Sequence, residues 1–225
     1  MAQKLQVFEK ESESLKLTSY FEKILGPAIN ACRFSGSPPA VRIEKNLGSP
    51  GEFRPWNYDD VFLDSDIVDW SQVNQARVYL HECAHSLCFK FFNKHGCELS
   101  HAHGPIFCMT ANVLYGRASH APGLEDLPLF LSFYEFSDCP PELIGVENWR
   151  SEVVRYVEST TELLADSKIS AEEIPELANG GWVCFLQDRK ERLDRAKVKN
   201  QGWILIAGAG WFLAAGCVFL LFRIW

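Results

Sequence analysis

The stretch QARVYLHECAHSLCFKFF, residues 75–92, is the most informative part of this chain. It contains neither glycine nor proline, and it presents apolar residues on most of its sides when drawn as an α-helix. A helix of this kind is normally buried in the core of a domain. Ionisable groups are costly there unless they are paired or bind a metal ion. The stretch therefore predicts a buried helix whose ionisable residues are the first candidates for function.

Three of these ionisable residues form the pattern H-E-x-x-H, at His81, Glu82 and His85. Residues four apart lie on the same face of an α-helix, so both imidazoles can bind one metal ion. The glutamate beside the first histidine is then placed to take a proton from a metal-activated water. A chance pattern with two ordinary core histidines is the alternative, and the buried helix disfavours it. We therefore expect a Zn²⁺ site with Glu82 as general base.

The composition of the chain limits the classes of function to be considered. Of its 225 residues 47% are hydrophobic and 23% are charged, which is typical of a folded domain with a substantial core. The formal net charge of −7 gives no reason to expect nucleic-acid binding. Residues 1–17 lack the apolar segment of a signal peptide. The eight cysteines include no C-x-x-C pair, so we expect reduced thiols in a cytosolic compartment.

Patterns along the chain predict a mainly helical domain with a small sheet, in the α+β class. We expect strands at residues 40–44 and 60–63, with a Gly/Pro-rich loop at 48–56 between them. We expect helices at residues 9–25, 75–92, 106–118, 146–167 and 183–199. Gly26-Pro27 is expected to end the first helix, and Gly180-Gly181 to interrupt the helical region near the C-terminus. Residues 121–145 are rich in proline and aromatic residues and are expected to be irregular.

The C-terminal residues have the pattern of a membrane anchor. Residues 203–222, WILIAGAGWFLAAGCVFLLF, carry no charge and are long enough as a helix to cross the hydrocarbon core of a bilayer. The preceding residues 188–202 hold six basic and three acidic side chains, which places that side in the cytosol. We therefore expect a single-pass membrane protein with a cytosolic domain and a helical stalk at residues 146–202. A small-residue face is a candidate surface for a homodimer, at Gly208, Gly210, Ala214 and Gly216.

A catalytic zinc usually has a third protein ligand, and the sequence offers several candidates. A metzincin would need a histidine at position 91 and a glycine at position 88, but these are Phe91 and Cys88. The nearby histidines are His95, His101 and His103. His95 lies in the turn before Gly96, where a solvated loop histidine is the better interpretation. His103 begins the segment HGPIF, in which Gly-Pro favours a tight entry into the next helix and Phe107 can pack beneath the site.

Taken in order, these parts make the chain resemble the SprT-like metalloproteases. The resemblance rests on the short strand VFLD at 61–64, the HECAH helix and the HGPIF segment, and it covers roughly Leu17 to Gly116. It implies a zincin-like metalloprotease domain at residues 1–145, with His81, His85 and His103 as Zn²⁺ ligands and Glu82 as general base. His101 is a lesser ligand candidate. The chain departs from the family in having a membrane anchor and no C-terminal cysteine ribbon, and its acidic charge makes a DNA-linked role doubtful.

The sequence thus predicts a membrane-anchored zinc endopeptidase that acts on a protein or peptide substrate. A rival assignment is a gluzincin of the HtpX type, because ELLAD at 162–166 resembles the E-x-x-A-D ligand box of that class, which would make Glu162 the third ligand. Two further functions stay open, a membrane-tethered scaffold with a structural zinc and a hydrolase that acts on a non-peptide substrate. Candidate donors to the oxyanion are left open as well, at Tyr115, Arg117 and His120.

Overall fold

The structure, a computed structural model, describes residues 2–57, 59–96, 103–127 and 139–196. The surroundings of side chains are described for the same residues except 2–14, 162 and 163. The chain divides into two compact units, residues 1–182 and residues 183–225. The residues of the predicted site all belong to the first unit, which has the α+β class expected from the sequence.

Three short strands form one sheet in the order β1-β3-β2. Strand β1 (Ala40–Glu44) runs parallel to β3 (Asp60–Asp64), and β2 (Gly51–Phe53) runs antiparallel to β3. All five residues of β3 are buried, as expected for the central strand of a covered sheet. The predicted strands at 40–44 and 60–63 are confirmed.

Strand β2 lies in the segment that the sequence predicted to be a loop, so that prediction is wrong for Gly51–Phe53. The glycine that suggested a loop is needed for a different reason. A Cβ atom added at Gly51 would lie 2.6 Å from Val78 Cγ1 and 3.1 Å from Glu82 Cγ. Both neighbours are side chains of the predicted metal-binding helix. Gly51 therefore lets the backbone of β2 approach that helix closely.

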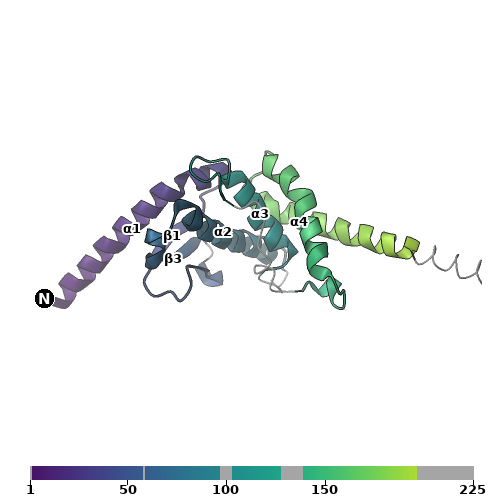
Figure 1. The fold of residues 1–225 in the computed structure, drawn as a ribbon. Helices are drawn as coiled ribbons and strands as arrows, with labels where there is room; N and C mark the ends of the chain where they lie inside the picture. Colours follow the sequence, from purple (N-terminus) through teal and green to yellow (C-terminus); the bar gives the residue numbers. More distant parts are fainter. Residues whose placement is uncertain (1, 58, 97–102, 128–138, 197–225) are drawn as a thin grey trace, which may run out of the picture. The chain divides into compact units, whose positions relative to one another are not determined.

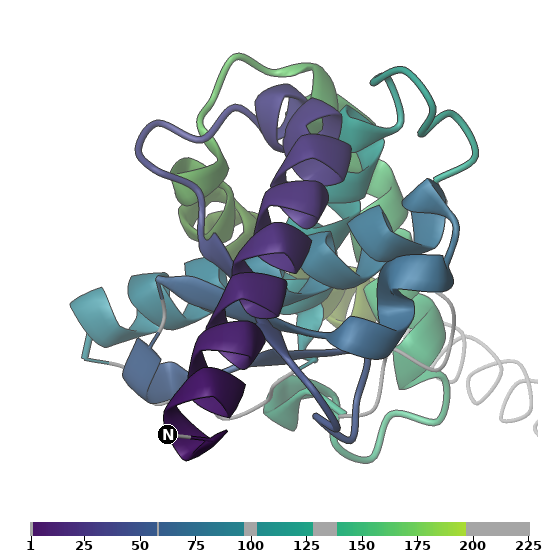
Figure 2. The same ribbon diagram turned by 90° about the vertical axis from the view of Figure 1, so that its left-hand side faces the viewer.

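Helices α1 (Ala2–Cys32) and α2 (Gln72–Lys94) pack against this sheet. Helix α3 (Pro105–Ala118) packs against both of them, and α4 (Trp149–Asp166) packs against α3. Helix α2 is central, because it contacts β2 and β3 as well as α1 and α3 (Figure 1). Helix α1 contacts β1, α2 and α3, and Figure 2 shows it in front of these elements. The helices expected at 75–92 and 106–118 are confirmed, and the HECAH pattern lies on the largely buried part of α2.

Helix α1 continues past the Gly26-Pro27 pair that was expected to end it, so that boundary is wrong. Pro27 removes one backbone N–H from the helix. The continuation is favoured because Ala28 and Cys32 bury their side chains completely, and α1 packs against α3. The helix ends where Arg33 adopts a left-handed conformation, with φ of 61°.

Helix α4 packs against α3, so the boundary predicted after residue 145 falls inside the first unit. Its apolar face buries Val153, Tyr156 and Val157. The predicted break at Gly180-Gly181 is wrong, because residues 174–196 are all helical. Tyr156 of α4 packs against this helix instead, with its hydroxyl donating to the carbonyl of Ala178 and its ring 5.1 Å from that of Trp182. In the second unit, described from residue 183 to 196, the expected helix is present.

Arg117 links the C-terminal ends of two helices and gives the first testable prediction. Its side chain is 3% exposed and donates to the carbonyls of Cys32 (3.0 Å), Leu164 (3.2 Å) and Ala165 (3.3 Å). Replacing Arg117 with methionine keeps much of the apolar stem but leaves these carbonyls without their donors. We expect it to lower the free energy of unfolding by about 3 kcal/mol or more, measured by urea unfolding. The exposed Arg155→Met variant is the control, and an equal change in both would contradict this role.

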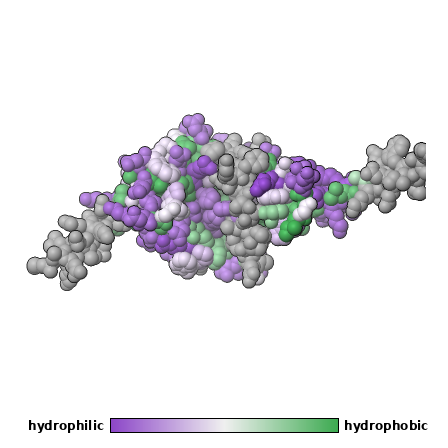
Figure 3. Space-filling model, turned by 60° about the horizontal axis from the view of Figure 1, so that its bottom comes forward, coloured by the Kyte–Doolittle hydropathy of each residue, from purple (hydrophilic) through white to green (hydrophobic). Residues whose placement is uncertain are grey.

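The surface in Figure 3 is mainly hydrophilic, with smaller hydrophobic areas between the polar residues. Among the described residues, no helix combines the length and the apolar character needed to cross a membrane. The predicted membrane span at residues 203–222 lies outside the described residues, as do the small residues proposed for a homodimer.

Candidate metal centre

Helix α2 places His81 and His85 side by side. Its first turn is capped by Ser71, whose hydroxyl accepts a hydrogen bond from the backbone N–H of Asn74 at 3.3 Å. The four-residue spacing then brings the two imidazoles onto one face, with ring centroids 4.9 Å apart. The relation expected from the sequence pattern is therefore present.

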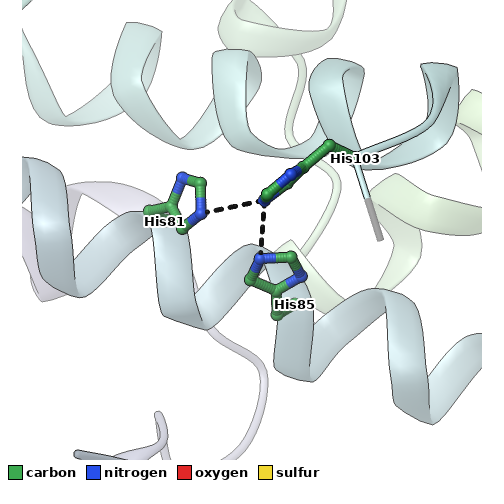
Figure 4. A group of neighbouring side chains, drawn as sticks. All are labelled: His81, His85 and His103. Atoms are coloured by element: carbon green, nitrogen blue, oxygen red, sulfur yellow. Dashed lines mark hydrogen bonds between the residues drawn. The ribbon is translucent and has the colours of Figure 1, made fainter. Parts of the chain in front are cut away.

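His103 reaches the same point from the start of α3. Gly104 is the N-cap residue of that helix and Pro105 is its first residue, which confirms the tight entry expected from HGPIF. The Nε2 atom of His103 lies 3.1 Å from Nε2 of His85 and 3.3 Å from Nε2 of His81. Figure 4 shows the three rings pointing toward one another, two from α2 and one from the start of the neighbouring helix.

These separations fit a zinc ion. With Zn–N bonds of 2.0–2.1 Å, two ligands of a tetrahedral site lie about 3.3–3.4 Å apart. The candidate ligand atoms of the three histidines all lie within 4.8 Å of one another. Three histidine ligands leave one tetrahedral position for water or substrate, which is the usual composition of a catalytic zinc site. The donor set therefore fits Zn²⁺.

The surroundings keep the imidazoles of His81 and His85 in the neutral form that metal ligation requires. Burial, with the nearby His103 and Arg77, lowers the pKa of His81 to about 4. Burial, with His81 and His103, lowers the pKa of His85 to about 2. At neutral pH both rings therefore have a free nitrogen lone pair for a metal ion.

Two phenylalanines enclose the histidines. The ring of Phe107 stacks on His85 at 4.2 Å between centroids, and it lies 5.0 Å from His81 and 4.8 Å from His103. This confirms that Phe107 packs beneath the site. Phe53 of β2 also lies near His85, with centroids 6.2 Å apart and nearly parallel rings. Such apolar walls exclude water and strengthen electrostatic interactions at the site.

Glu82 is adjacent to the histidines and is only 8% exposed. Burial raises the pKa of its carboxyl to about 7, partly offset by a hydrogen bond from the backbone N–H of Phe53. The negative charge of Glu52 raises it further. A carboxyl with a pKa near neutrality is suited to both accepting and releasing a proton. The backbone of β2 thus orients the predicted general base, a contribution that the sequence analysis missed because it assigned residues 51–53 to a loop.

The remaining candidate ligands are not in this cluster or are not described. His95 is the C-cap residue of α2, and its ring contacts Phe91 at 4.7 Å. His101 and the side chain of Glu162 lie outside the described residues. The described residues thus bring together the ligand set predicted from the resemblance, His81, His85 and His103. The gluzincin ligand set is not tested, because the side chain of Glu162 is not described.

Of the three candidate oxyanion donors, only Tyr115 lines the cavity next to His81 and Glu82. Its hydroxyl donates to the backbone carbonyl of Arg77 at 3.2 Å. Arg117 instead binds the helix-end carbonyls described above, and His120 is exposed after the end of α3.

Comparisons with protein-family models, with curated proteins and with solved structures gave no match for this chain. The resemblance to the SprT-like metalloproteases therefore stays a prediction that rests on the quoted motifs.

Proposed function

We propose that this protein is a zinc-dependent endopeptidase in which His81, His85 and His103 hold the metal and Glu82 is the general base. One observation carries the proposal: the Nε2 atoms of three histidines converge, with His103 3.1–3.3 Å from the other two, beside a buried carboxyl group. A purely structural zinc site has no need of such a carboxyl, and usually has four protein ligands. This favours a catalytic site over a scaffold. The zincin-like, SprT-like character of the domain is part of the same proposal.

The chemistry divides between the metal and the chain. When bound, Zn²⁺ supplies Lewis acidity that polarises the scissile carbonyl and lowers the pKa of water. Glu82 takes up the proton of the attacking water and passes it to the leaving amine. Phe53 holds the Glu82 carboxyl in place through its backbone N–H. Phe107 and Phe53 keep bulk water away from the histidines.

The proposal is tested by zinc content and proteolysis together. The purified full-length chain is expected to hold about one zinc per chain, measured by atomic absorption, and to hydrolyse casein. A chelator is expected to abolish hydrolysis, and added Zn²⁺ to restore it. His81→Ala or His85→Ala is expected to remove the metal. Tight stoichiometric zinc that survives both changes would contradict the ligand assignment.

We also propose that residues 203–222 anchor the protein in a membrane, with the peptidase domain in the cytosol. Removing residues 203–225 is expected to move the protein from the membrane fraction to the soluble fraction, because the uncharged segment is lost. Fractionation followed by immunoblotting measures this, and protease protection of an N-terminal tag reports its side of the membrane. Release of the full-length chain by carbonate or high salt would exclude a membrane span.

A further inference from the structure

A cavity of about 430 Å³ lies directly beside the metal centre. Its lining includes His81 and Glu82 of α2, the backbone of Gly51 at the start of β2, and Tyr115 of α3. This volume is within the range of small-molecule and side-chain binding pockets. Because the cavity contains both a metal ligand and the proposed base, a group bound in it would lie next to the reacting bond.

One strip of α2 forms the floor of the cavity. Asn74, Arg77, Val78, His81 and Glu82 all line it, at the three- and four-residue spacings that share a helix face. The strip leads from the metal centre toward the N-terminus of α2. From Glu82 to Asn74 it covers about 12 Å at the helical rise. That length suits roughly three to four residues of an extended peptide.

Two residues bound the cavity. The backbone of Gly51 closes one side of it against Val78 and Glu82, so closely that a Cβ atom added there would lie 2.6 Å from Val78 Cγ1. Trp70 lines the end remote from the metal and is 43% exposed. Its backbone carbonyl accepts a hydrogen bond from Gln75 Nε2 at 3.0 Å, which fixes this residue against the start of α2.

The cavity has a positive charge at a defined place. Among the described residues that line it, Arg77 is the one arginine or lysine and Glu82 the one carboxylic acid. Arg77 lies one helical turn before His81, close enough for its charge to act on that imidazole. The N-terminal end of α2 adds a partial positive charge on the same side.

We propose that this cavity binds a carboxylate group of the substrate, with Arg77 as the residue that recognises it. This proposal rests on the proposed peptidase function and names a substrate class for it. A guanidinium binds a carboxylate through two parallel hydrogen bonds, a geometry that an ammonium group does not provide. Trp70 offers an apolar face to the neighbouring part of the peptide. The carboxylate comes either from an aspartate or glutamate side chain near the scissile bond or from the C-terminus of the peptide.

Binding is measured first, so that the test does not depend on hydrolysis. The probe is a fluorescently labelled peptide, titrated by anisotropy into the full-length Glu82→Gln chain. Four versions of the peptide are compared: an internal glutamate or glutamine, each with a free or an amidated C-terminus. The carboxylate is expected to tighten binding about 10- to 100-fold, as is typical of a hydrogen-bonded charged group. The version that binds tightly identifies the side chain or the C-terminus as the source.

Variants then assign the effect to Arg77. Arg77→Ala is expected to remove the preference for the carboxylate, and Arg77→Lys to restore only part of it. Arg77→Glu is expected to reverse the preference toward a lysine-containing peptide. Arg42→Ala is the matched control, because Arg42 pairs with Asp60 on the sheet at 3.0 Å and does not line the cavity. Zinc content and circular dichroism are measured for every variant to show that each one is folded.

The same substitutions in the active chain give the second readout. Peptide products identified by mass spectrometry should show cleavage next to a carboxylate in the unmodified chain and loss of that preference in Arg77→Ala. Equal binding of all four peptides, or an unchanged preference in Arg77→Ala, would overturn the proposal. If the chain hydrolyses nothing but the carboxylate preference still depends on Arg77, the cavity assignment stands and the peptidase function is what fails.

Discussion

Replacing Glu82 with glutamine is expected to leave the zinc content unchanged and to lower peptide hydrolysis by about 10²-fold or more. The substitution keeps the size and nearly the shape of the side chain. It removes the group that takes up the proton of the attacking water. The three candidate metal ligands are histidines, and Glu82 is not one of the ligands. Metal binding should therefore not depend on Glu82.

The structure explains why no neighbouring group should substitute for this carboxyl. Glu82 is the carboxylic acid that lines the cavity beside His81, within the part of the chain that the structure describes. Its position is fixed by the backbone N–H of Phe53, and burial raises its pKa to about 7. A glutamine can accept the same hydrogen bond but has no comparable basicity. The loss should therefore appear in kcat, with a smaller change in KM.

Glu52→Gln is the matched control for this experiment. Glu52 lies on β2 close enough to Glu82 to influence it electrostatically, yet it forms a salt bridge with Arg54 at 3.2 Å. Its replacement should change hydrolysis by only a few-fold. Zinc is measured by atomic absorption and hydrolysis with a quenched fluorescent peptide. Full activity in Glu82→Gln would mean that this helix does not carry the catalytic centre.

The sequence predicted the helix of the site well because its signal is local. The spacing of His81 and His85 needs only regular helical geometry to bring both rings onto one face. The start of α3 was also predictable, because Gly104-Pro105 is a local helix-entry signal. The choice of His103 as third ligand came from a family resemblance. The structure now brings its ring to the other two.

The parts that the sequence did not predict depend on contacts between distant segments. A glycine such as Gly51 gives the same local sequence signal in a loop as in a strand that approaches a helix closely. Only the contact with Val78 distinguishes the two cases. The role of Phe53 at Glu82 was hidden for the same reason. Pro27 and Gly181 are local helix breakers that tertiary packing overrides, through the burial of Cys32 in one case and of Tyr156 in the other.

Replacing His103 with alanine is expected to weaken zinc binding by more than about 100-fold. Changes of residues that only support metal ligands already cost 10–100-fold, so loss of a ligand should cost more. The two remaining histidines sit on one helix, and the protein would then lack a ligand from the α3 side. Affinity is measured by competition with a zinc chelator of known strength. His95→Ala is the matched control, because His95 is the C-cap residue of α2 and is not in the cluster.

The matching substitution Glu162→Ala separates the two proposed ligand sets. If His103 is the third ligand, Glu162→Ala should keep the metal and change the free energy of unfolding by about 0.5 kcal/mol or less. The position of Thr161, which directly precedes Glu162, supports this expectation. The hydroxyl of Thr161 lies 3.0 Å from Asn112 Nδ2, and Asn112 is about 10 Å along α3 from the end that carries His103. Zinc lost from Glu162→Ala but kept in His103→Ala would replace the proposed site with the gluzincin arrangement. The opposite pattern would establish that α2 and the start of α3 together form the metal centre.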